Sequence, residues 1–170
     1  MHHLNIEIKA QSKNPEAIRM KLEELNADFK GTDYQKDTYF NCTKGRLKLR
    51  EGNIENHLIH YFRPNQEGPK KSEVTLFRSD PESSLKTVLT KALGILTVVE
   101  KKRAIYFIDN VKFHIDLVTE LGSFVEIEAI DSTGDIGAFQ LMKQCNHYID
   151  LFGISDNDLV ANSYSDMRLV

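Results

Sequence analysis

The chain has 170 residues, of which 41% are hydrophobic and 28% are charged, a composition typical of one folded domain with a substantial core. Its net charge of −3 favours neither nucleic acid nor an anionic membrane as a partner. No apolar run approaches the roughly 20 residues of a transmembrane helix, and no signal-peptide core is visible near the N-terminus. Because Cys42 and Cys145 are widely separated, we predict free thiols in a reducing compartment and a cytoplasmic location. The length of the chain predicts a single domain over residues 1–170.

The first half of the sequence predicts one helix among short strands. Residues 4–11 alternate apolar and polar side chains, as a half-buried strand does. Asn14 and Pro15 then supply an N-cap and a first helical position, and the apolar spacing predicts a helix to about Asn26. Further strands are predicted at 34–42, 46–50 and 57–63, and a polar loop at 64–71.

The second half continues this pattern. A strand at 73–78 precedes a helix that is predicted to start at Asp80-Pro81-Glu82 and to stop at Gly94. Short turns then separate three strands, and a last helix spans 135–152. These strands are predicted at 97–108, 111–118 and 123–130. The segment after Gly153 gives no clear pattern.

About eight strands and three helices result, and the helices fall in only some of the gaps between strands. This spacing argues against parallel βαβ winding and favours an antiparallel meander. A sheet of so many strands tends to close, because closure removes its unpaired edges. The predicted fold class is therefore α+β, mainly β: an eight-stranded antiparallel closed barrel with helices packed outside.

Charged residues occupy one face of several predicted strands. Glu126 and Glu128 share a face of one strand, and Asn5, Glu7 and Lys9 share a face of another. If both faces turn into one cavity, three carboxylates and an ammonium group conflict unless a cation or an anionic ligand joins them. A divalent metal that holds a polyphosphate would resolve the conflict. Periodicity alone also allows an ordinary sheet whose charged face meets solvent.

Together, the motifs resemble the CYTH family, which comprises class IV adenylate cyclases and thiamine and inorganic triphosphatases. They are Asn-Ile-Glu-Ile-Lys at 5–9, Lys-Leu-Arg at 48–50, Lys-x-Arg-x-x-Tyr at 101–106, and Asp116 followed by Leu-Gly-x-Phe-x-Glu-Ile-Glu at 121–128. The resemblance covers residues 4 to about 152, and Ser163-Tyr164-Ser165-Asp166 is similar to the cyclase-like branch. It implies an eight-stranded tunnel with acidic and basic clusters inside.

The resemblance also implies roles for single residues. A divalent ion, Mg²⁺ or Mn²⁺, would be held by Glu7, Asp116, Glu126 and Glu128. The triphosphate would be bound by a basic set, in which Lys9 and Arg103 are also assigned to catalysis. That set is Lys9, Lys48, Arg50, Arg63, Arg78, Lys101 and Arg103. The chain departs from the family motif Glu-x-Glu-x-Lys at Asn5, where an uncharged amide leaves the metal affinity and metal choice open.

Three functions remain open at this point. The first is a cyclase-like reaction of ATP to cyclic AMP and pyrophosphate, which the similarity to the cyclase branch favours. The second is hydrolysis of tripolyphosphate, a nucleoside triphosphate or thiamine triphosphate. The third is binding of a nucleotide or polyphosphate without turnover, which Asn5 keeps open. In each case the partner is a triphosphate-bearing small molecule such as ATP, not nucleic acid or membrane. Members of the cyclase branch are often homodimers, although no self-complementary patch is visible.

Overall fold

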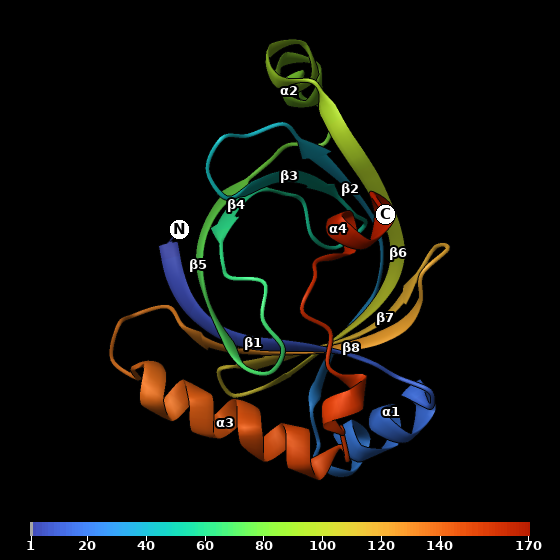
Figure 1. Ribbon diagram of the computed structural model, residues 1–170, viewed down its shortest axis with the longest axis vertical. Coiled ribbons are helices and arrows are strands. Elements are labelled where there is room, and N and C mark those ends of the chain that lie inside the picture. Colours follow the sequence, from blue (N-terminus) through green and yellow to red (C-terminus); the bar gives the residue numbers. More distant parts are fainter. Residues whose placement is uncertain (1) are drawn as a thin grey trace.

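The computed structural model describes residues 2–170, and it contains a closed antiparallel barrel (Figure 1). The order of the strands around the barrel is β1-β5-β4-β3-β2-β6-β7-β8, and pairing of β8 with β1 closes it. The predicted fold class is confirmed. The strands are β1 (His2–Gln11), β2 (Asp28–Phe40), β3 (Arg46–Glu51), β4 (His57–Phe62), β5 (Lys70–Arg78), β6 (Ile95–Ile108), β7 (Val111–Val118) and β8 (Gly122–Asp131).

The helices lie mainly outside the barrel (Figure 1). Helix α3 (Ala138–Leu151) packs on β1 and β8, α1 (Pro15–Glu24) lies beside it, and α2 (Leu85–Leu93) projects from the far side of the barrel. A short turn η1 (Asp156–Asp158) and helix α4 (Tyr164–Arg168) follow α3. Within residues 2–170, the structure contains no helix with the length and apolarity that crossing a bilayer requires.

The main hydrophobic core lies between the barrel wall and the two helices α1 and α3. Apolar side chains of β1, β7 and β8 point outward, where they meet Leu22 of α1 and Leu141 of α3, both fully buried. Because side chains alternate along a strand, the charged residues of these strands must point into the barrel. The structure therefore decides for a charged tunnel and against a sheet with its charged face in solvent.

The C-terminal segment crosses one end of the barrel (Figure 1). The backbone N–H of Val160 donates to the Lys9 carbonyl at 2.9 Å, and the Lys70 ammonium donates to the Ala161 carbonyl at 2.9 Å. Tyr164 is buried and packs edge-on against Phe124, with 5.1 Å between ring centroids. The segment thus closes this end of the barrel, and the other end stays open.

Several element boundaries differ from the sequence-based prediction, among them the starts of β2, α2 and β5. Strand β2 begins at Asp28, six residues early, because a bulge between Phe29 and Gly31 interrupts the alternation that marks a strand. Helix α2 begins at Leu85 instead of Asp80. The Asp80 carboxylate accepts from the Glu82 backbone N–H at 3.0 Å, and this bond stabilises a separate turn before the helix. Lys70 and Lys71, predicted in a loop, belong to β5.

The two cysteines are expected to differ in reactivity. Cys145 is fully buried in α3, and burial raises the pKa of its thiol to about 12, whereas Cys42 is exposed. Because the thiolate is the reactive form, iodoacetamide at pH 8 should modify Cys42 and leave Cys145 intact, as mass spectrometry of peptides can show. Denatured protein is the control, in which both should react. Equal modification of the native protein would contradict the described packing of α3.

Candidate active site in the barrel

The barrel encloses a cavity of about 350 Å³, and all eight strands contribute to its wall. This volume falls within the range of about 300–1,000 Å³ that small-molecule sites occupy. Six cationic side chains line it against four glutamates, so the wall favours an anionic ligand. The cations are Lys9, Lys48, Arg50, Arg63, Arg103 and Lys112, and the glutamates are Glu7, Glu55, Glu126 and Glu128.

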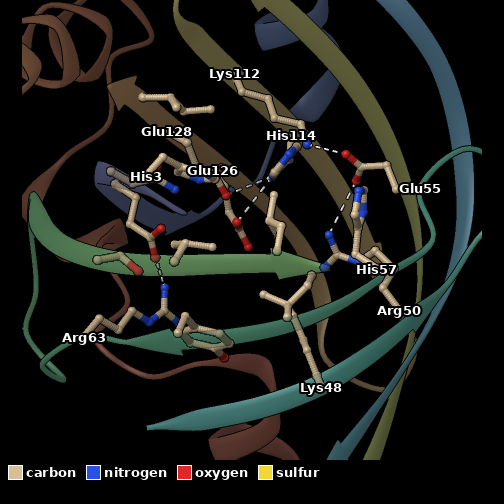
Figure 2. A pocket seen from close by; sticks show the side chains of 18 of the residues that line it. His3, Lys48, Arg50, Glu55, His57, Arg63, Lys112, His114, Glu126 and Glu128 are labelled. Carbon is tan, nitrogen blue, oxygen red and sulfur yellow. Dashed lines mark hydrogen bonds and ion pairs between the residues drawn. The ribbon is translucent and has the colours of Figure 1, made fainter. Parts of the chain in front are cut away.

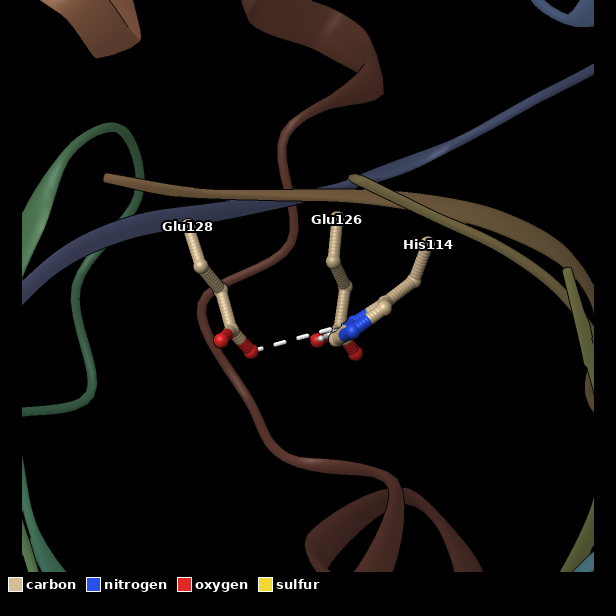
Figure 3. Close-up of side chains that lie close together, drawn as sticks. All are labelled: His114, Glu126 and Glu128. Atoms are coloured by element: carbon tan, nitrogen blue, oxygen red, sulfur yellow. Dashed lines mark hydrogen bonds and ion pairs between the residues drawn. The ribbon is translucent and has the colours of Figure 1, made fainter. Parts of the chain in front are cut away.

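His114, Glu126 and Glu128 form the one group of donors suited to a metal ion among the described residues (Figure 3). One ligand atom from each lies within 4.8 Å of the others. His114 Nδ1 is 3.3 Å from Glu126 Oε2 and 3.8 Å from Glu128 Oε1. Burial, and then the charge of Arg103, lower the pKa of His114 to about 3, so its imidazole is neutral at pH 7 and can act as a ligand. Its Nε2 is buried without a hydrogen-bond partner.

Glu7 lies beside this group, because Glu7 and Glu128 are register partners on β1 and β8. Glu7 is ion-paired with Arg63. Burial, and then the negative charge of Glu7, raise the pKa of Glu128 to about 7. The crowding that the sequence predicted is therefore present, and a cation here would relieve it.

Asp116, which was also assigned to the metal, is hydrogen-bonded to Arg103 and Tyr164. Its carboxylate accepts from Arg103 Nε at 2.7 Å and Nη2 at 2.6 Å, and from the Tyr164 hydroxyl at 2.7 Å. Both carboxylate oxygens are thus engaged, and Asp116 does not belong to the group around His114. Its evident effect is to fix the guanidinium of Arg103, whose Nη2 also lies 3.4 Å from Glu126 Oε1.

Asp37 is a central residue of the site that the sequence analysis missed. It is fully buried and accepts from Arg50 at 2.9 and 2.8 Å and from Lys101 at 2.7 Å, while Lys48 lies 3.2 Å away. Burial alone would raise the pKa of Asp37, but Arg50, Lys101 and Lys48 outweigh burial and hold it well below its usual range. Asp37 lies two residues before Tyr39 on the same strand, so their side chains point to the same face. This alternation was the sequence signal that could have identified Asp37.

The predicted cations divide into three groups. Lys9, Lys48, Arg50, Arg63 and Arg103 meet on the cavity wall. Lys101 is buried against Asp37 and does not line the cavity, and Arg78 is exposed at the open rim, outside it. Lys9 Nζ lies 3.7 Å from Glu126 Oε1 and 3.7 Å from the centroid of the Tyr164 ring. Burial lowers the pKa of Lys9 to about 7.

An ion pair at the open end was also missed. Lys112 pairs with Glu55, and Arg50 Nη1 lies 3.4 Å from Glu55 Oε1 (Figure 2). Lys112 shares its strand face with His114, so periodicity could have found it. Glu55 lies in the loop before β4, where no periodic signal exists. The loop is fixed by Asp33, whose carboxylate accepts from the backbone N–H groups of residues 54 and 55 at 2.9 Å.

Comparisons with known proteins support the observed fold. The model of the CYTH domain family matches residues 3–164. A protein of Methanocaldococcus jannaschii with the name "Putative adenylate cyclase" is 25% identical, over 97% of this chain and 98% of its own. The PH1012 protein of Pyrococcus horikoshii has 25% identity and a TM-score of 0.77, over 95% of this chain and 98% of its own. A cyclase-like protein of Hippeastrum has 13% identity and a TM-score of 0.62, over 98% of this chain and 94% of its own.

Replacement of Asp37 by asparagine is expected to destabilise the protein strongly. The change leaves three buried or half-buried cations, Lys48, Arg50 and Lys101, without their shared carboxylate, and breaking a buried ion pair on one side costs about 3–5 kcal/mol. Urea unfolding should show this loss, and added tripolyphosphate should restore part of it. Asp150→Asn on the exposed face of α3 is the control. A loss below about 1 kcal/mol in Asp37→Asn would contradict the described network.

Replacement of Glu126 by glutamine is expected to weaken Mn²⁺ binding at least about tenfold. The substitution keeps the shape of the side chain and removes the charge that contacts His114, Lys9 and Arg103. Because Arg103 keeps both hydrogen bonds to Asp116, the chain should remain folded with some loss of stability. Isothermal titration with Mn²⁺ measures the effect, with Glu73→Gln on the outer face of β5 as the control. Unchanged affinity would reject Glu126 as a ligand. The same titration of Asp116→Asn decides whether that carboxylate contributes.

Proposed function

Because the chain belongs to the CYTH family, we propose that it is an enzyme that acts at a phosphorus atom of a triphosphate held inside the barrel. The first candidate reaction converts ATP to cyclic AMP and pyrophosphate. One observation carries the proposal: six cations and the group of His114, Glu126 and Glu128 face the same cavity of about 350 Å³. The cations can bind the phosphate oxygens, and His114, Glu126 and Glu128 can bind the divalent ion that accompanies a triphosphate.

The cations would divide the work of binding. Arg63 and Arg50 offer planar guanidinium groups that contact two phosphate oxygens at once, and Lys48 and Lys9 offer mobile point charges. In the free protein these cations are neutralised by Glu7, Glu55, Asp37 and Glu126. A triphosphate would therefore share partners that are already in place, and little rearrangement of the wall is needed.

Arg103 is the best-positioned group for stabilising charge that develops during the reaction. Two hydrogen bonds from its guanidinium to Asp116 fix the plane of the side chain, and Tyr164 fixes Asp116 in turn. Donors that are already oriented stabilise a transition state without the cost of reorganisation. We therefore assign catalytic contact with the phosphates to Arg103 and, from its place beside Glu126, to Lys9.

The donor set fits a divalent ion, Mg²⁺ or Mn²⁺. His114, Glu126 and Glu128 would hold it, with Glu7 adjacent, and a bound ion would supply neutralisation of phosphate charge. The neutral imidazole of His114, whose Nδ1 faces Glu126 and Glu128, would add a nitrogen ligand, which favours Mn²⁺ over Mg²⁺ relative to a site built only from oxygen.

In the cyclase reaction, the 3′-hydroxyl oxygen of ATP bonds to the α-phosphorus, the bond from that phosphorus to the bridging oxygen breaks, and pyrophosphate leaves with its electron pair. The hydroxyl proton passes to solvent or to a basic side chain. The similarity over 97% of the chain to a protein named "Putative adenylate cyclase" supports this candidate.

A second candidate is hydrolysis, in which water attacks the terminal phosphorus and the bond from that phosphorus to the bridging oxygen breaks. The diphosphate leaves with its electron pair, the attacked phosphorus becomes orthophosphate, and the proton of the water passes to solvent or to a basic side chain. One comparison supports it: the Hippeastrum protein is described as a putative adenylyl cyclase that "reveals a dominant triphosphatase activity". The same cations and the same ion would serve this reaction, because the two reactions differ in the nucleophile and in the phosphorus that it attacks but not in the triphosphate group that the site holds.

A product assay tests the proposal. Purified protein with Mg²⁺ or Mn²⁺ is incubated with ATP, GTP, thiamine triphosphate or tripolyphosphate, and the products are separated by chromatography. Cyclic AMP with pyrophosphate establishes the cyclase, and orthophosphate with a diphosphate establishes the triphosphatase. Glu126→Gln is the matched control for metal-dependent turnover. Binding of ATP without any product would reject both reactions and leave a nucleotide-binding protein.

Replacement of Asn5 by glutamate is expected to have opposite effects without and with metal. Asn5 is buried two residues from Glu7 on the inner face of β1. A further carboxylate beside Glu7 and Glu128 should lower the thermal midpoint in EDTA by like-charge repulsion. With Mn²⁺ present it should raise metal affinity severalfold, as calorimetry can measure. Unchanged metal dependence would show that position 5 is not near enough to be a ligand.

A further inference from the structure

One wall of the cavity, at its open end, carries no Lys, Arg, Asp or Glu side chain, and His3 and His57 flank it. It is built from four neighbouring strands, β8, β1, β5 and β4, and we call it the neutral wall. Charged groups, among them Glu55 and Lys112, line other parts of the cavity (Figure 2). A ligand that consisted of phosphate alone would have no use for an uncharged surface of this kind. The neutral wall consists of Asn5, Ile59, Ser72, Val74, Leu76 and Ile130.

Two polar atoms of the neutral wall lack partners. Asn5 is 3% exposed and Ser72 is 1% exposed, and the two residues are register partners on β1 and β5. Asn5 Oδ1 and Ser72 Oγ are both buried without a hydrogen-bond partner. A buried polar atom without a partner lowers stability, so such atoms in a cavity point to a ligand that supplies the missing hydrogen bonds.

The surroundings of these two atoms define the chemistry of that ligand. On the other side of Asn5, its register partner is Ile130, and the side chains of Val74, Ile59 and Leu76 continue the wall. A flat apolar group with an N–H or O–H donor at its edge matches this combination, because the amide oxygen of Asn5 can only accept. Amino-substituted heterocycles, as in adenine or the aminopyrimidine of thiamine, have this character.

We infer that the neutral wall binds the organic part of an organic triphosphate, with Asn5 and Ser72 as hydrogen-bonding residues that select it over inorganic tripolyphosphate. This inference rests on the proposed function, because it takes the cationic part of the same cavity as the phosphate site. It also gives Asn5 a role that a glutamate could not perform, since a carboxylate there would add charge to the neutral wall.

Binding measurements on variants test the inference. Isothermal titration in EDTA, where turnover does not consume the ligand, compares ATP, thiamine triphosphate and tripolyphosphate. Loss of one hydrogen bond in Asn5→Ala or Ser72→Ala should weaken binding of the organic ligand about 5- to 10-fold relative to tripolyphosphate. The organic ligand that shows the loss identifies the heterocycle. Glu73→Ala, exposed on the outer face of β5, is the control and should change neither affinity.

Thermal unfolding verifies that the variants remain folded. Asn5→Ala and Ser72→Ala each remove a buried atom without a partner, so their midpoints should equal or exceed that of the wild type. Equal weakening of all three ligands, or no weakening, would overturn the inference and leave the proposed function intact, and the unpaired atoms would then be solvated by water. A wild-type protein that binds none of the three ligands, even with Mn²⁺ added, would overturn both proposals.

Discussion

The structure depends on mutual neutralisation of charges inside a closed barrel. The apolar faces of β1, β7 and β8 pack against α1 and α3 on the outside of the barrel. The opposite faces of these strands, which carry the charged residues, must therefore point inward. Such an interior is stable only if each charge has a partner, since an unpaired buried charge costs several kcal/mol. Asp37 with its three cations, and Asp116 with Arg103, meet this requirement.

The same requirement prepares the cavity for its ligand. Carboxylates behind the wall, such as Asp37 and Asp116, are saturated and hold Arg50 and Arg103 in fixed orientations. Carboxylates on the wall, such as Glu128, stay crowded, and the pKa of Glu128 rises to about 7. A cation and a triphosphate would relieve this crowding together. The fold thus separates groups that maintain the barrel from groups that await a ligand.

Much of this arrangement could be predicted from the sequence, because strand periodicity is a local property. The inner face of β1 through Glu7 and Lys9, and that of β8 through Glu126 and Glu128, followed directly from it. Contacts between strands that are far apart in the chain could not be predicted from periodicity. The pairing of Asp116 with Arg103 joins two strands and did not follow from periodicity, and Glu55 reaches the cavity from a loop. Burial made His114 a neutral candidate ligand, which sequence alone does not reveal.

The most direct test of a metal-assisted triphosphate site in the barrel is a crystal structure of the protein with Mn²⁺ and tripolyphosphate, with anomalous scattering recorded at the manganese edge. The predicted result is an anomalous peak bounded by His114, Glu126 and Glu128, with phosphate density against Lys9, Lys48 and Arg63. Manganese bound elsewhere, or phosphate found only outside the barrel, would contradict the assignment of this cavity as the active site.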